Sequence, residues 1–154
     1  MPSRMVGVAA ARAGGPAVPR EDDRTDGGAS MSRRLGVGAA LVDGVLVPGD
    51  VALDGDRVEA VGLPAAAGGR IAAPGLVDLQ VNGFDGVDVM TADADGLAHV
   101  GRALAARGVT SWLPTLVTAS RASTDAALDV LATACRPDAT PDGARPLGVH
   151  LEGP

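Results

Sequence analysis

The stretch PGLVDLQVNGFDG, from Pro74 to Gly86, decides how this chain folds. It begins at a Pro-Gly break and ends in a glycine-rich loop, and the short apolar run between them has the length and content of a buried strand. Because side chains alternate along a strand, its polar and aliphatic residues fall on opposite faces. Such a strand suits a barrel, in which the outer face meets helices and the upper inner face reaches a polar site. The polar face consists of Asp78, Gln80 and Asn82, and the aliphatic face of Val77, Leu79 and Val81.

The residues after this stretch alternate between helix and strand patterns, which is the rhythm of a β/α barrel. A helix is predicted from about Asp93 to Arg107, followed by a strand over Val109 to Val117. Pro114 is expected near the end of that strand, where its missing N–H does least harm. Ser120 is predicted to cap a second helix, and Leu147 to Leu151 is the third predicted strand.

The residues before Pro74 have a β pattern with two hairpin signals. Asp43-Gly44 lies between two aliphatic triplets, and residues 54–56 (Asp-Gly-Asp) separate a second pair of short runs. These strands are too few and too short to bury a core alone, so we expect them to pack onto something further along. Residues 1–30 have a disorder-prone composition and are interpreted as a tail, or as an extension before a natural start at Met31.

The composition excludes several classes of function. The chain has 154 residues, a formal net charge of -6 and a pI near 4.7, and it contains no basic block. We therefore expect no nucleic-acid partner and no membrane partner, and a cytoplasmic protein. A single cysteine, Cys135, excludes an internal disulfide, and it is expected in the core of the second helix.

Two residues near the end of the chain are candidates for chemistry. His150 and Glu152 share one face of the third predicted strand, and in a β/α barrel the carboxyl ends of the strands form the active-site face. Glu152 is thus placed like a metal ligand or an acid–base group; alternatively, it caps a following helix, and the pattern leaves both open. His150 is interpreted as a hydrogen-bonded inner-layer residue rather than a ligand.

Other polar residues do not form a recognisable site. The cluster that contains Asp93 and Asp95 fails as a calcium loop, because Arg102 falls where a bidentate Glu is needed. No glycine-rich run leads into Lys-Ser or Lys-Thr, so a phosphate loop is not supported. His99 is expected at the surface of the first helix.

Three blocks of sequence carry a resemblance to a known family. PGLVDLQVNG, GVTSWLPT and LGVHLEGP resemble, in order and spacing, the N-terminal part of the N-acetylglucosamine-6-phosphate deacetylases of the amidohydrolase superfamily. The resemblance covers about Leu35 to Pro154. It implies an α/β fold with part of a small β-sandwich domain at 35–73 and the first three β/α units of a truncated TIM (β/α)8 barrel at 74–154. Residues 1–34 would be a disordered tail or a start-site extension.

The resemblance also implies a set of site residues. Many amidohydrolases carry a His-x-His pair at the end of the first barrel strand, where this chain has Gln80 and Asn82. Neutral amides are poor ligands for a zinc-like ion, so these two are expected to line the site and a tight second metal is not expected. Glu152 matches the family's metal-binding glutamate, and the implied cofactor is one divalent ion, zinc or similar.

The implied reaction is hydrolysis of the acetamide of N-acetylglucosamine 6-phosphate, a small amino-sugar phosphate, by a metal-activated water. The family's catalytic aspartate and its two histidine ligands have no counterpart here, so no catalytic residue is assigned in this chain. The 154 residues alone are predicted to be inactive, and a homo-oligomer is possible at full length. The alternatives are another amide hydrolase of the superfamily, or a non-catalytic remnant.

Overall fold

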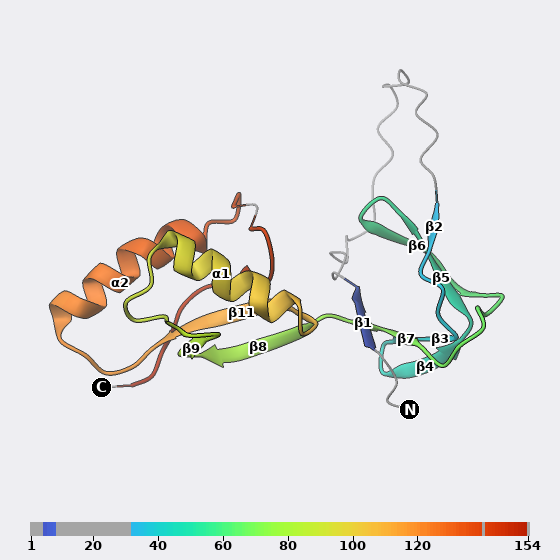
Figure 1. Cartoon of the computed structure of the whole chain (residues 1–154), viewed down its shortest axis with the longest axis horizontal. Helices are drawn as coiled ribbons and strands as arrows, with labels where there is room; N and C mark the ends of the chain where they lie inside the picture. The colour runs from blue at the N-terminus through green and yellow to red at the C-terminus, as the bar shows by residue number, and fades with distance from the viewer. Residues whose placement is uncertain (1–4, 9–31, 140, 154) are drawn as a thin grey trace, which may run out of the picture. The chain divides into compact units, whose positions relative to one another are not determined.

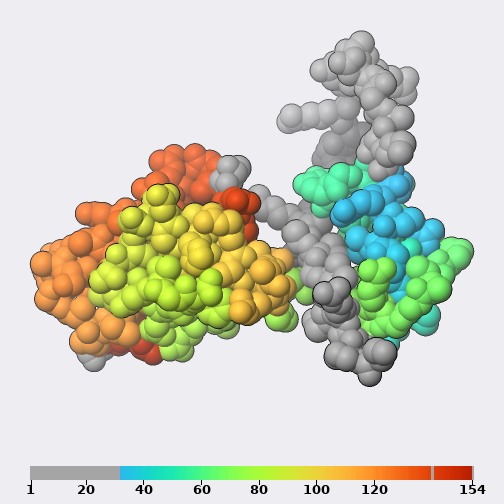
Figure 2. Space-filling view, in the orientation of Figure 1, coloured from blue at the N-terminus to red at the C-terminus, as the bar shows by residue number. Residues whose placement is uncertain are grey.

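The computed structural model describes residues 5–8, 32–139 and 141–153. The chain divides into two compact units, Met1–Pro74 and Gly75–Pro154 (Figures 1 and 2). The described residues contain mostly strands and two helices, which confirms the α/β class. Within the described residues, neither helix is long and apolar enough to cross a membrane.

The first unit is built from two small sheets that share one apolar cluster. One sheet has the order β1-β7-β3-β4 and the other the order β2-β5-β6. The strands are β1 Met5–Val8, β2 Arg33–Arg34, β3 Ala39–Val42, β4 Val45–Pro48, β5 Asp50–Asp54, β6 Arg57–Leu63 and β7 Ile71–Pro74. Both sheets contribute to the buried cluster, which consists of Val37, Ala40, Val51, Leu53 and Ala72.

Both predicted hairpins are confirmed. β3 pairs antiparallel with β4 around Asp43 and Gly44, whose φ angles are 49° and 79°. Positive φ at both turn residues matches the right-handed twist of the strands, and this geometry favours Asp-Gly. β5 pairs with β6 in the same way, and Asp54 lies opposite Arg57 at the turn.

Two strands lie in residues 1–34, where the sequence predicted a tail. β1 pairs parallel with β7 from the Met5–Ile71 pair to the Val8–Pro74 pair, and β2 pairs antiparallel with β5. The β1 segment is a short apolar run, and such a run adds to a sheet edge more readily than its polar surroundings do. The rest of the predicted tail before residue 32 lies outside the described residues.

The second unit is a parallel sheet with helices on one side (Figure 1). β11 is its central strand and pairs with β8, β12 and β13, all parallel. The elements are β8 Leu76–Val81, β9 Gly83–Phe84, β10 Val87–Asp88, α1 Ala94–Ala105, β11 Val109–Leu116, α2 Arg121–Ala134, β12 Arg145–Pro146 and β13 His150–Leu151. Trp112, which is 1% exposed, lies in the core between the sheet and the helices, and its indole N–H donates to the Ala144 carbonyl at 3.1 Å.

Local signals set the bounds of both helices. Asp93 caps α1 by accepting from the Gly96 N–H at 2.8 Å, and Ser120 caps α2 by accepting from the Ser123 N–H at 3.2 Å. Gly108, with a φ of 87°, follows the end of α1. The predicted cap at Ser120 is therefore confirmed, and Asp93, where the first helix was predicted to begin, caps α1.

Two expectations about the strands are only partly right. Of the strand predicted over Leu147–Leu151 only β13 forms, and β12 lies before the predicted range. Pro114 lies near the end of β11 as predicted, but β11 is the central strand and Pro114 pairs with Val81 of β8. Side-chain hydrogen bonds join the strands around this position.

The three aliphatic residues predicted to share one face of β8 do not all lie on it. Val81 is 5% exposed and joins the core with residues of both helices. Val77 and Leu79 are 53% and 63% exposed. Val81 lies opposite Pro114 and Val77 opposite Ser111, which are on opposite faces of β11, so the register shift between Asp78 and Val81 breaks the predicted alternation.

Candidate functional site

Glu152 contacts both amide side chains of β8. Its Oε1 accepts from Gln80 Nε2 at 2.5 Å, and its Oε2 accepts from Asn82 Nδ2 at 3.1 Å. Gln80 and Glu152 are exposed and Asn82 is half-buried. The three residues predicted to line one site thus lie side by side, although Glu152 is 70 or more positions from the two amides in sequence.

The parallel sheet explains this convergence. Gln80 is the second-to-last residue of β8 and Asn82 follows that strand, while Glu152 comes directly after β13. The Glu152 N–H donates to the Leu116 carbonyl at 2.9 Å, which extends the ladder along the last residue of β11. The carboxyl ends of parallel strands meet at one edge, where α/β folds hold their ligands.

The geometry also bears on whether Glu152 is a helix cap. A capping carboxylate accepts from backbone N–H groups at a helix start. Both oxygens of Glu152 accept from side-chain amides instead. This arrangement favours a site residue over a cap.

His150 lies one step deeper in the sheet and is half-buried. Its Nδ1 is 3.1 Å from the carbonyl oxygen of Leu79, on the far side of the central strand. The imidazole therefore joins the two strands that carry the amides and the carboxylate.

A cavity of about 470 Å³ opens at the same edge. Asn82 is the one candidate residue in its lining, so the cavity adjoins the carboxylate–amide cluster rather than enclosing it. The lining residues are Asn82, Gly83, Gly86, Val87, Asp88, Met90 and Val117.

The described residues do not by themselves complete a metal site. A catalytic zinc ordinarily takes three protein ligands, and within residues 5–8, 32–139 and 141–153 no group of three His, Cys, Asp or Glu side chains could hold an ion. Glu152 offers one carboxylate, and the amides beside it present N–H donors to that carboxylate.

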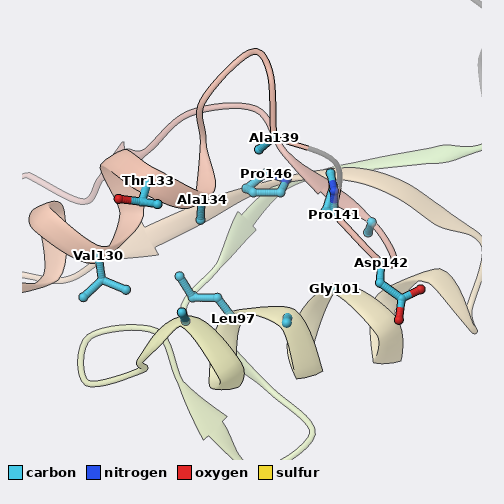
Figure 3. Close-up of a pocket in the computed structure, with 12 residues that line it drawn as sticks. Leu97, Gly101, Val130, Thr133, Ala134, Ala139, Pro141, Asp142 and Pro146 are labelled. Atoms are coloured by element: carbon cyan, nitrogen blue, oxygen red, sulfur yellow. The ribbon is translucent and has the colours of Figure 1, made fainter.

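A second hollow, of about 210 Å³, lies on the helix side (Figure 3). Leu97 of α1 and Val130 and Ala134 of α2 face it, together with Pro146 of β12. Its lining is mostly apolar and contains none of the predicted site residues. It is a packing groove between the helices and the segment that returns to the sheet.

Three further features add to the sequence-based interpretation or differ from it. His99 lies at the surface of α1 as expected, with its side chain 45% exposed, and its Nε2 lies 2.9 Å from Asp85 Oδ2. Asp85-Gly86, both with positive φ, form the turn of an unpredicted β9–β10 hairpin, which the Asp-Gly pair could have signalled. Cys135 ends α2 half-buried rather than in the core, and burial raises the pKa of its thiol.

The fold matches solved structures of one class of enzyme, the sugar-phosphate deacetylases. No family model matches the chain. A variant of N-acetyl-D-glucosamine-6-phosphate deacetylase from Mycobacterium smegmatis, solved in complex with N-acetyl-D-glucosamine-6-phosphate, matches with a TM-score of 0.64 and 28% identity. The match covers 80% of this chain and 33% of that one.

Curated relatives narrow the class further. The N-acetylglucosamine-6-phosphate deacetylase of Rattus norvegicus is 48% identical over 90 residues, which are 56% of this chain and 21% of that protein. The N-acetylgalactosamine-6-phosphate deacetylase of Escherichia coli O157:H7 is 42% identical over 85 residues, which are 55% and 22%. Over about half of its length, this chain is homologous to the N-acetylglucosamine-6-phosphate deacetylases. The matched stretch spans about a fifth of the curated relatives.

Proposed function

We propose that this chain supplies the first part of a deacetylase that hydrolyses the acetamide of N-acetylglucosamine 6-phosphate to glucosamine 6-phosphate and acetate. The observation that carries the proposal is the contact of Glu152 with Gln80 and Asn82 at the carboxyl edge of a parallel sheet. The homology to deacetylases supports the chemistry, and the bound sugar phosphate of the Mycobacterium relative supports the substrate class.

In this proposal, the second unit forms the start of a (β/α)8 barrel. β8, β11 and β13 would be its first three strands, with α1 and α2 on the outer side. The first unit would be part of a flanking β-sandwich. The aliphatic side chains of Val77 and Leu79 on β8 are exposed, as expected of a strand that further barrel elements would cover.

Glu152 would be one ligand of a single divalent metal ion, zinc or similar. Such an ion supplies a water of lowered pKa that attacks the amide carbonyl. Its other ligands and the catalytic acid–base group would come from outside the described residues. Gln80 and Asn82 would hold the carboxylate in place, and their neutral amides would disfavour a second ion.

Grafting tests the proposal directly. Residues 74–154 of this chain would replace the segment they align with in the rat deacetylase, and acetate release from N-acetylglucosamine 6-phosphate would be measured with zinc present. We expect a metal-dependent deacetylase. The Glu152→Gln graft should lose more than about a hundredfold in kcat, because even residues behind the ligands cost about 10–100-fold.

Two outcomes would contradict the proposal. A folded graft that binds the sugar phosphate but releases no acetate would exclude this segment from the deacetylase site. Equal activity of the parent and Glu152→Gln grafts would exclude Glu152 as a ligand. Separately, acetate release by the 154-residue chain alone would contradict the conclusion that the described residues do not complete a metal site.

N-acetylgalactosamine 6-phosphate is a second candidate substrate, because the N-acetylgalactosamine-6-phosphate deacetylase of Escherichia coli O157:H7 is 42% identical to this chain over the matched residues. The two sugars differ in the orientation of one hydroxyl group. Measuring kcat/KM of the graft for both sugar phosphates distinguishes them if the grafted segment contacts that hydroxyl. We expect the glucosamine derivative to be preferred, since the Rattus norvegicus deacetylase named for it is 48% identical to this chain and the one named for the galactosamine derivative is 42% identical.

A further inference from the structure

The centre of the parallel sheet contains a residue that cannot complete the ladder. Pro114 lies in β11, between β8 and β13, and has no backbone N–H to donate. Proline is ordinarily confined to edge strands and bulges. Here the register shifts between the Asp78–Trp112 pair and the Val81–Pro114 pair, which is a β-bulge.

The bulge places an extra residue on β8. Leu79 and Gln80 together lie opposite the single residue Leu113. The backbone groups at this point therefore need partners other than the regular ladder, because buried or half-buried N–H and C=O groups are costly without a hydrogen bond.

Thr115 provides the first replacement bond. Its hydroxyl accepts from the Val81 N–H at 3.0 Å and donates to the Leu113 carbonyl at 3.0 Å. The side chain is fully buried, so both bonds form away from water. One hydroxyl thus joins the two strands where the proline interrupts them.

His150 provides the second. It lies opposite Thr115 in the β11–β13 ladder, and its Nδ1 is 3.1 Å from the Leu79 carbonyl oxygen. A carbonyl oxygen can only accept, so this bond requires the proton on Nδ1 and leaves Nε2 unprotonated in the neutral ring. The imidazole connects β13 to β8 across the central strand.

This bond lies directly behind the candidate site. Leu79 precedes Gln80, and His150 is two residues before Glu152 on the same side of its strand. We infer that His150 is a positioning residue: its Nδ1–H···O=C bond to Leu79 holds the ends of β8 and β13 in the register that brings Gln80 against Glu152. The effect on hydrolysis rests on the proposed function, whereas the hydrogen bond and the positioning do not.

Two substitutions separate positioning from bulk. In His150→Asn the side-chain amide N–H lies near the place of Nδ1, so the bond to Leu79 is kept. In His150→Gln the amide lies near the place of Nε2, so the bond is lost. Both would be compared with the unaltered 154-residue chain by ¹H–¹⁵N NMR, without metal or substrate and at one fixed pH.

Three signals give the answer. In the unaltered chain, Nδ1 of His150 should be protonated and Nε2 should not. The side-chain amide signals of Gln80 should move toward free-amide values in His150→Gln and stay in place in His150→Asn. Glu152→Gln, which weakens the acceptor directly, should move them in the same direction as His150→Gln. The indole N–H of Trp112, bonded to Ala144 on the helix side, should be unchanged in all variants and reports that the unit is folded.

The inference is overturned if Nε2 carries the proton in the unaltered chain, a result that needs no variant to fold. It is also overturned if the Gln80 signals are the same in His150→Gln as in the unaltered chain. In the active graft, His150→Gln should lower kcat about tenfold, which is the loss typical of residues that support a metal ligand. The kcat of the His150→Asn graft should stay near that of the parent graft. An inactive parent graft would refute the proposed function and leave the NMR result standing.

Discussion

Each unit of this protein contains a carboxylate that accepts several hydrogen bonds from residues distant in sequence, and the two carboxylates differ in what surrounds them. Asp50 in the first unit is 2% exposed and accepts from the backbone N–H groups of Val37 and Val51, and from Arg34 Nε at 3.0 Å. Glu152 in the second unit is exposed and accepts from two neutral side-chain amides.

The difference separates a carboxylate that stabilises the fold from one that is available to a ligand. Backbone donors and a guanidinium bind Asp50 from fixed positions, and the Val37 N–H above all holds the pKa of Asp50 below its ordinary value, assisted by Val51 and Arg34 and opposed by burial. The partners of Glu152 are neutral side-chain amides, one exposed and one half-buried, which a metal ion could displace without leaving a buried charge unpaired.

The largest effect is expected from Asp50→Asn. The asparagine side chain has one acceptor oxygen, so it cannot accept from the two backbone N–H groups on one side and from the Arg34 guanidinium on the other, as the carboxylate does. The first unit should therefore unfold at a clearly lower urea concentration. The fluorescence of Trp112, the chain's single tryptophan, reports the second unit, so a urea transition seen by circular dichroism and absent from this fluorescence reports the first. Asp43→Asn, the same substitution at an exposed turn of the same unit, should change the free energy of unfolding by less than about 0.5 kcal/mol.

The second effect is a pH dependence confined to the first unit. Because the pKa of Asp50 is lowered in the folded state, its contribution to stability is complete above the unfolded value, near 3.8, and is lost as the pH falls through the lower folded value. Urea midpoints measured below about pH 4 should therefore fall more steeply for the parent than for Asp50→Asn. If the urea midpoints of the parent and of Asp50→Asn fall equally with pH, Asp50 is not the cause of the acid sensitivity of the first unit.

A smaller loss is expected from Arg34→Lys. Arginine donates both to Asp50 and to the Pro64 carbonyl, and a lysine ammonium does not reproduce this two-point contact. Because the Arg34 side chain is 44% exposed, the cost should be only about 1 kcal/mol in the free energy of unfolding. No change in the urea midpoint would mean that the backbone N–H groups alone hold Asp50.

The smallest effect on stability is expected from Glu152→Gln. Its contacts are exposed side-chain bonds, so the free energy of unfolding of the second unit should change by less than about 0.5 kcal/mol, measured by Trp112 fluorescence in urea. Glu152→Gln should thus greatly lower the activity of the graft and leave the free energy of unfolding of the second unit nearly unchanged. A loss as large as that of Asp50→Asn would place Glu152 among the residues that hold the fold.

Signals between residues close in sequence predicted the fold well. The Asp43-Gly44 turn and the cap at Ser120 each depend on residues at most four apart, and the structure has both. The alternation in β8 placed Gln80 and Asn82 on one face, and the strand order then brought them to Glu152. These features follow from local propensity and from the period of a strand.

The features that were missed depend on distant residues. The interior position of Pro114 is tolerated because Thr115 reaches Val81, 34 positions away, and His150 reaches Leu79, 71 positions away. Nothing within a few residues of the proline indicates those partners. For the same reason the sequence did not predict the split between β12 and β13, or that Asp50 is a buried charge paired with Arg34.

The most direct test of this account is an NMR distance measurement in the uniformly labelled chain. We expect nuclear Overhauser effects from the side-chain amide protons of Gln80 and Asn82 to the Hγ protons of Glu152, because both amides donate to its carboxylate. If Glu152 shows contacts to α1 or α2 and none to either amide, its carboxylate lies on the outer side of the sheet, and Glu152 is not placed as the proposed metal ligand.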